Sequence, residues 1–150
     1  MFWMIPEPAK HRVELYFDGV FDHDPRAILL ELRRMVPDVR YADESFDFLV
    51  DFSRVRDLPS VHAKSGEQAL DWLCVNGLRR CASILASATQ RMVVSRRTGN
   101  DPRFDYFLSR DEAEWWLAKD LPHSARKRSR LTIGKNGAQW GTNIKHDSSR

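Results

Sequence analysis

The chain is predicted to be an α/β protein with a mixed sheet of four or five strands, an N-terminal β-hairpin and helices packed mainly on one face. Three observations support this class. Residues 46–86 follow a strand, helix, strand pattern, and such a unit requires parallel strands. Residues 11–17 alternate apolar and polar side chains, which is typical of a half-buried strand. Helix-start signals precede three apolar stripes of helical period.

The N-terminal hairpin is expected at residues 11–21. An Asp-Gly pair at 18–19 is a strong turn signal after the alternating strand, so residues 20–21 begin the expected return strand. Residues 1–9 then form an N-terminal arm ahead of the domain. A helix should follow, with Asp24 as its N-cap and Pro25 in its first turn. Its apolar stripe consists of Ile28, Leu32, Met35 and Val36, and Pro37 is expected to end it.

The middle of the chain contains the region in which we expect the functional site. An apolar strand at 48–52 leads into a polar segment at 53–65, and the capping pattern at 65–68 opens an amphipathic helix. An Asn-Gly pair at 76–77 suits a helix C-cap, and the next strand covers 81–86. Ligands and partners of open α/β sheets usually meet loops at the carboxyl ends of the strands. The segment 53–65 is therefore the predicted functional loop.

The last third of the domain is less regular. Residues 89–97 fit either an irregular helix or a short strand, and Val93 and Val94 favour the strand. A strand is expected at 104–108, followed by a helix through residue 119 that begins with a second capping pattern. Trp115 and Trp116 are adjacent on this helix and lie about 100° apart, so one of them should be exposed.

Charge divides the chain into a body and a tail. Of 24 basic residues seven lie in 121–150, with one of the 21 acidic residues, so this segment carries +6 and the first 120 residues carry −3. One domain is expected at 10–119, followed by a basic, flexible tail at 120–150. Nucleic acid or an anionic membrane is a weaker partner hypothesis for the tail, through Arg126, Lys127, Arg128 and Arg130. A solvated tail is the simpler alternative.

Composition favours a cytoplasmic protein. No apolar run approaches the roughly 20 residues of a membrane span, and the first five residues lack the features of a signal peptide. Cys74 and Cys81 are expected to be reduced and buried. The five histidines show no metal-binding spacing, and no catalytic triad can be assembled around Asp51. We therefore expect a protein that is not an enzyme and needs no cofactor or metal.

Several segments, in this order, resemble STAS domains of the SpoIIAA-like branch. These segments are the strand and turn at 49–55 (LVDFSRV), the Asp-Trp-Leu helix at 71–73 and the closing helix at 112–117 (EAEWWL). The resemblance covers about 10–119 and implies a SpoIIAA-like fold, which is also grouped with CRAL-TRIO-type lipid-binding domains. It further implies a regulatory, non-enzymatic role in the docking of another protein.

In regulatory members of that family a loop serine is switched by phosphorylation. Counting from Asp51, the corresponding position is Ser60, although the family motif Asp-Ser-Ser-Gly reads Pro-Ser-Val-His here. A phosphate at a helix N-terminus would be stabilised by free N–H groups, but an ordinary cap serine is the simpler identity. The expected interaction loop contains Asp51, Ser53, Asp57, Ser60 and His62.

Two functions thus remain open. The first is docking of a protein partner through 53–65 and the following helix. The alternative is a module of the same fold that binds a lipid or another apolar ligand between helices and sheet, suggested by the exposed tryptophan and by Phe2 and Trp3. A homodimer is compatible with either function.

Overall fold

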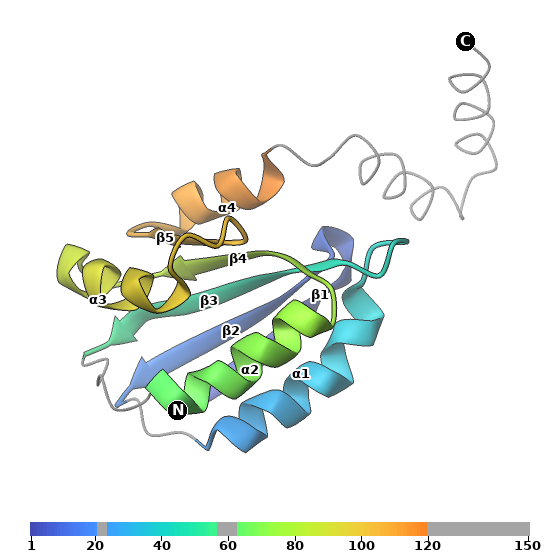
Figure 1. Cartoon of the computed structure of the whole chain (residues 1–150), viewed down its shortest axis with the longest axis horizontal. Helices are drawn as coiled ribbons and strands as arrows, with labels where there is room; N and C mark the ends of the chain where they lie inside the picture. Colours follow the sequence, from blue (N-terminus) through green and yellow to red (C-terminus); the bar gives the residue numbers. More distant parts are fainter. Residues whose placement is uncertain (21–23, 57–62, 120–150) are drawn as a thin grey trace, which may run out of the picture.

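The computed structural model describes residues 1–20, 24–56 and 63–119 and has a five-stranded mixed sheet at its centre. The strands are β1 (Phe2–Glu7), β2 (Arg12–Gly19), β3 (Phe46–Val55), β4 (Leu78–Ile84) and β5 (Phe104–Phe107), and they lie in this order across the sheet (Figure 1). β1 runs antiparallel to β2, and the other neighbouring pairs are parallel. The predicted fold class is confirmed.

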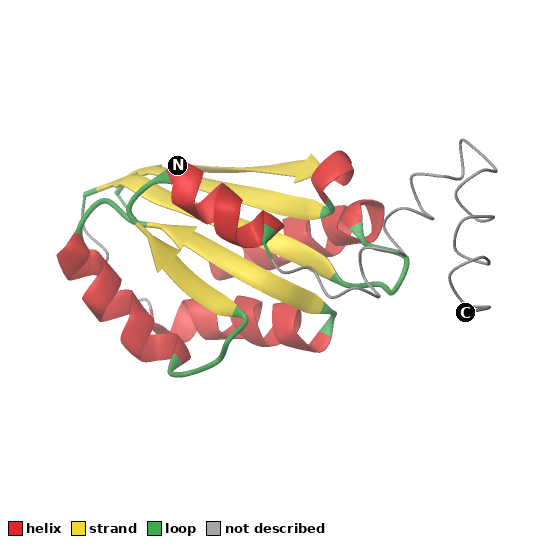
Figure 2. Cartoon of the chain, turned by 90° about the horizontal axis from the view of Figure 1, so that it is seen from above, coloured by secondary structure: helices red, strands yellow, loops and turns green. Residues whose placement is uncertain are grey.

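Within the described residues, four α-helices cover the sheet. The connections between the parallel strands are α1 (Pro25–Val39), α2 (Ala63–Val75) and α3 (Ala88–Thr98), and α4 (Arg110–Ala118) follows β5. Figure 2 shows the sheet between the connecting helices on one side and α4 on the other. Within the described ranges no helix combines the length and apolar character needed to cross a membrane.

The hairpin is one strand earlier than expected. Residues 2–7, predicted as part of an N-terminal arm, form β1, and the turn to β2 passes through the short 3-10 segment η1 (Pro8–Lys10). Gly19 ends β2 and pairs with Val55, so the Asp-Gly pair at 18–19 is not the hairpin turn. Pro6 is tolerated because β1 is an edge strand. Phe2 and Met4 pack against the core, which explains why this segment joins the sheet.

α1 begins as predicted but ends later. The carboxylate of Asp24 accepts a hydrogen bond from the backbone N–H of Arg26 at 2.9 Å, and Pro25 occupies the first turn. Pro37 lies inside the last turn instead of ending the helix. Proline removes only one N–H there, and burial of Val39 in the core favours the extra turn.

β3 is longer than predicted and continues through the first part of the expected loop. Residues 53–55 belong to the strand, where Arg54 and Val55 pair with β2 after a register shift and Val55 is buried. α2 begins at Ala63, two residues before the predicted capping pattern. It ends ahead of Gly77, whose φ of +101° agrees with the predicted helix-ending glycine. β4 starts at Leu78, earlier than the predicted 81–86.

Residues 88–98 form α3, so the strand favoured by Val93 and Val94 is wrong for this segment. Ser87 caps α3 by accepting a hydrogen bond from the N–H of Gln90 at 3.2 Å. Ser109 caps α4 in the same way, as its capping pattern predicted. The core has two parts: a large cluster between the sheet and α1 and α2, and a smaller one between α4 and the opposite face.

Candidate functional site

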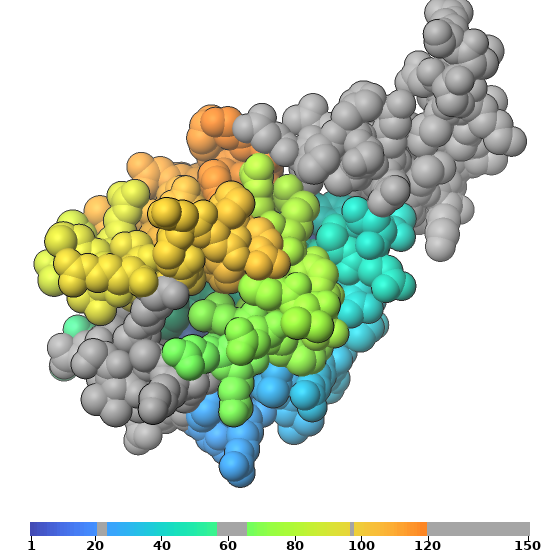
Figure 3. All heavy atoms as spheres, in the orientation of Figure 1, coloured from blue at the N-terminus to red at the C-terminus, as the bar shows by residue number. Residues whose placement is uncertain are grey.

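An apolar pocket lies between the sheet and the three connecting helices, with a volume of about 140 Å³. Figure 3 shows this side of the molecule, where a hollow separates α2 (green) from α3 (yellow). The residues that line the pocket are Leu15, Phe17, Ile28, Leu32, Phe48, Val50, Phe52, Gly66, Ala69, Leu70, Leu73, Cys81, Ser83, Val94, Thr98, Phe104 and Tyr106. The pocket therefore extends along the parallel strands toward their carboxyl ends.

The sheet forms the floor of the pocket. Because side chains alternate between the two faces, every second residue of β2, β3, β4 and β5 points toward the helices. Phe17 and Phe52 lie on neighbouring strands with their rings stacked, at a centroid distance of 5.0 Å and an interplanar angle of 5°. This stacked pair makes a rigid aromatic wall near the ends of β2 and β3.

Small residues of α2 leave the pocket open above that floor. Gly66 and Ala69 lie one turn apart on the lining side of the helix, and a Cβ added at Gly66 would meet no atom within 4 Å. Leu70 and Leu73 complete this wall, while α1 closes the far side. The space thus exists because a helix with a small-residue stripe spans a sheet of large apolar side chains.

Three hydroxyl groups and one thiol interrupt the apolar lining. The hydroxyls of Thr98 on α3 and Tyr106 on β5 are hydrogen bonded to each other. Burial raises the pKa of the Cys81 thiol to about 12, although a hydrogen bond from Ser83 acts in the opposite direction. The thiol is therefore protonated at neutral pH. None of these four groups was singled out by sequence reasoning for this pocket, because each looks like an ordinary core or helix residue.

The expected interaction loop starts and ends at the pocket. Phe52 precedes it, Gly66 follows it, and both line the cavity. Gln90 of α3 ties the end of β3 to the end of β4, since its Nε2 donates to the carbonyl of Val55 at 3.3 Å and its Oε1 accepts from the N–H of Ala86 at 3.0 Å. These two hydrogen bonds thereby fix the ends of the two strands and the start of α3 relative to one another.

The structure places only part of the predicted site. Asp51 is half-buried in β3, where strand alternation directs it to the face opposite the pocket, and its carboxylate accepts a hydrogen bond from the N–H of Ser53 at 2.8 Å. Ser53 is exposed in the strand and is not a loop residue. The remaining predicted site positions lie outside the described residues, namely Asp57, Ser60, His62, Arg126, Lys127, Arg128 and Arg130.

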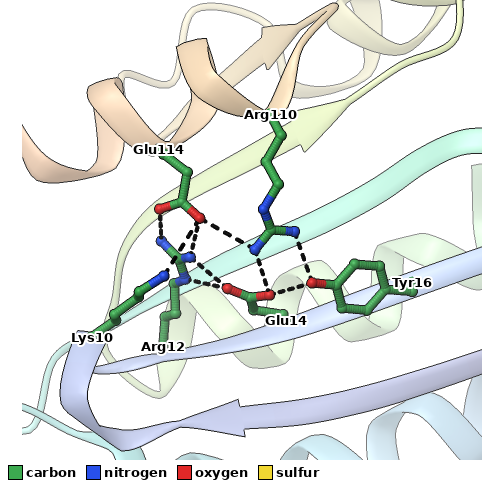
Figure 4. A network of polar contacts seen from close by, with 6 residues as sticks. All are labelled: Lys10, Arg12, Glu14, Tyr16, Arg110 and Glu114. Carbon is green, nitrogen blue, oxygen red and sulfur yellow. Dashed lines mark hydrogen bonds and ion pairs between the residues drawn. The ribbon is translucent and has the colours of Figure 1, made fainter.

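A second polar cluster lies on the opposite face, where α4 meets β2 (Figure 4). It consists of Lys10, Arg12, Glu14, Tyr16, Arg110 and Glu114. Arg12 shares the polar side of β2 with Glu14 and is buried there, with Nε donating to Glu14 at 2.7 Å and Nη1 to Glu114 at 2.6 Å. Arg110 donates to Glu14 at 2.8 Å and to the Tyr16 hydroxyl at 2.7 Å. The charges pair with one another, so the cluster fastens α4 to the sheet.

The pKa values within this cluster reflect the pairing. Burial opposes the negative charge of Glu14, but hydrogen bonds from Arg110 and Tyr16 and the charge of Arg12 outweigh it, so its pKa is lowered. A hydrogen bond from Arg12 likewise lowers the pKa of Glu114, against the effect of burial. Both carboxylates thus remain ionised at neutral pH. Their guanidinium partners are on the far side of the sheet from the pocket.

Comparisons with known proteins add no assignment to this geometry. No protein-family model, curated protein or solved structure matches the chain. Among the described residues, no three histidine, cysteine, aspartate or glutamate side chains are placed to hold a metal ion. The apolar pocket beside the ends of the parallel strands is therefore the candidate site.

Proposed function

We propose that the protein is a small binding module that takes an apolar ligand in the pocket between the sheet and α1, α2 and α3. The pocket itself carries this proposal. Its volume of about 140 Å³ is close to that of an engineered apolar cavity of roughly 150 Å³ that binds benzene. Its lining of aliphatic and aromatic side chains with a few hydroxyls is typical of small-molecule sites.

Binding without catalysis is the form that the lining favours. The described lining residues supply hydroxyls and one protonated thiol, and none of them is a carboxylate, an imidazole or an amine that would activate such a group. We therefore propose a carrier or sensor and not an enzyme. A cytoplasmic location is proposed with it, in keeping with two free cysteines.

Docking of a protein partner is the second candidate. It rests on the resemblance to STAS domains and on one structural observation: the segment between Phe52 and Gly66 begins and ends at pocket residues. A ligand in the pocket would contact both ends of that segment. We propose that ligand binding and docking through 53–65 are coupled if the protein has such a partner, with homodimerisation as one form of docking.

An NMR titration of the full chain with toluene tests ligand binding. We expect saturable shifts of amide signals from β4, β5 and α3 in the native protein. Ala69→Leu should weaken binding at least tenfold, because the added carbons occupy the cavity. Ala118→Leu makes the same change on the exposed side of α4 and should leave binding unchanged. Absence of saturable shifts in the native protein, or equal binding by Ala69→Leu, would rule out the pocket as a ligand site.

A further inference from the structure

The size of the pocket limits the ligand, given that the pocket binds one as proposed above. A cavity of about 140 Å³ accommodates roughly one aromatic ring, or an alkyl segment of similar volume. A long acyl chain would have to extend beyond the described walls. The buried part of the ligand is therefore the size of a single ring.

The charge of the lining limits the ligand further. No described lining residue carries a charge, so an ionised group within the pocket would have no counter-ion. Moving an unpaired carboxylate or ammonium group out of water is strongly unfavourable. Arg103, which precedes the lining residue Phe104, is already paired with Asp101 through a 2.7 Å contact. An acidic or basic ligand is thus disfavoured relative to a neutral one.

The hydroxyl groups supply the third constraint. A hydroxyl has one donor and two acceptor sites, so Thr98 retains hydrogen-bonding capacity after pairing with Tyr106. Ser83 adds a hydroxyl on β4, between the strands that carry the aromatic wall and Tyr106. An apolar ring that entered alone would leave this capacity unused, whereas a ring with a hydroxyl or carbonyl group would use it. A ligand hydroxyl or carbonyl group that pairs with Thr98 gains a hydrogen bond in place of the one it gives up to water.

We propose that the pocket recognises a neutral molecule with one ring-sized apolar part and one hydroxyl or carbonyl group, which hydrogen bonds to the Thr98–Tyr106 pair. Simple phenols and short alcohols have this chemistry. The discriminating contact comes from α3 and β5, and the apolar contacts come from β2, β3 and α2. The elements that select the polar group of the ligand thus differ from those that bind its apolar part.

The affinities of toluene, 4-methylphenol and 4-methylbenzoate for the full chain test this proposal. These probes share a methyl-substituted ring and differ in having no polar group, a neutral hydroxyl and a charge. A wholly apolar site would bind 4-methylphenol roughly tenfold or more weakly than toluene, because its hydroxyl would lose its hydrogen bonds to water. We expect 4-methylphenol to bind at least as tightly as toluene, and 4-methylbenzoate at least tenfold more weakly than either.

Matched variants locate the hydrogen bond. Thr98→Val keeps the shape of the side chain. It should lower the affinity for 4-methylphenol about tenfold and change the affinity for toluene by less than twofold. Thr89→Val makes the same change at an exposed position of α3 and should alter neither affinity. Three results would overturn the neutral, hydrogen-bonded ligand while leaving an apolar site. They are tenfold tighter binding of toluene than of 4-methylphenol, tightest binding of 4-methylbenzoate, and an unchanged affinity of Thr98→Val for 4-methylphenol. Failure of all three probes to bind would overturn the proposed function itself.

Discussion

Arg12 on β2 and Glu114 on α4 are 102 residues apart in the sequence, yet Nη1 of Arg12 donates to Oε2 of Glu114 at 2.6 Å. The same guanidinium also binds Glu14 on its own strand, so one buried cation joins the N-terminal hairpin to the last helix of the domain (Figure 4). The opposite face of the sheet is thereby closed by charge pairing as well as by the small apolar cluster under α4. The pocket face combines apolar contacts with the hydrogen bonds of Gln90 and of the Thr98–Tyr106 pair.

Removal of the Arg12 side chain should destabilise the protein substantially. In Arg12→Ala we expect the free energy of unfolding to fall by about 3 kcal/mol, because Glu14 and Glu114 lose a buried partner. Arg34→Ala is the matched control, since Arg34 pairs with Glu31 at 2.7 Å on an exposed helix surface and should cost less than about 0.5 kcal/mol. Urea denaturation measures both, and equal losses would contradict the assigned role of Arg12.

The cluster should also make stability depend on pH. The pKa of Glu14 lies below its ordinary value of 4.5 in the folded protein, so the unfolded chain binds the proton more readily. The stabilisation is then complete above pH 4.5 and is lost as the pH falls through the folded pKa. We expect the stability difference between the native protein and Glu14→Gln to shrink between pH 7 and pH 3.5. Effects of other titrating groups largely cancel in this difference, and a constant difference would contradict the prediction.

Gly77 should be intolerant of a side chain. Its φ is +101°, and an added Cβ would lie 2.7 Å from the carbonyl oxygen of Glu44, too close for any real contact. Gly77→Ala should therefore lower stability by about 2 kcal/mol or more, through backbone strain and displacement of the turn before β3. Gly66→Ala provides the contrast, because that site is helical and open and alanine should be neutral or stabilising by about 0.5 kcal/mol. Thermal unfolding of both variants checks this, and equal melting temperatures would refute it.

Sequence reasoning succeeded where the signal is local. Asp24 and Ser109 cap their helices as expected because a cap depends on hydrogen bonds to residues two or three positions away. The strand at β3 and the glycine after α2 were also recognisable, since an apolar run and an Asn-Gly pair at a helix end are local sequence patterns. The fold class followed from the order of such elements.

Sequence reasoning failed where contacts between residues far apart in the chain decide the structure. β1 forms because a partner strand offers hydrogen bonds to an otherwise unremarkable N-terminal segment. Val94 favours a strand locally, yet it lies in a helix that covers the pocket. The pocket depends on the spacing of three helices over the sheet, and the burial of Arg12 depends on a helix a hundred residues away. Neither relationship has a local sequence signal.

Trp115 and Trp116 should differ sharply although they are neighbours. Trp115 is 64% exposed, whereas Trp116 packs against Phe107 at a centroid distance of 5.6 Å and lies under the guanidinium of Arg80 at 5.0 Å. We expect Trp116→Ala to lower the free energy of unfolding by about 2 kcal/mol and Trp115→Ala by less than about 0.5 kcal/mol. The two variants are controls for each other in urea denaturation. A larger loss for Trp115→Ala would contradict the observed packing of α4.

The thiol of Cys81 should be unreactive in the folded protein. Its burial raises the pKa to about 12, so roughly one molecule in ten thousand carries the reactive thiolate at pH 8. In Cys74→Ala, which retains only Cys81, we expect labelling by a disulfide reagent to be at least a hundredfold slower in the native state than in urea. Cys81→Ala retains the half-buried Cys74, which should react faster than Cys81 because it is less enclosed. Labelling of native Cys81 at the rate of the unfolded chain would mean that the floor of the pocket is open to water, and the neutral lining inferred for the ligand site would then be wrong.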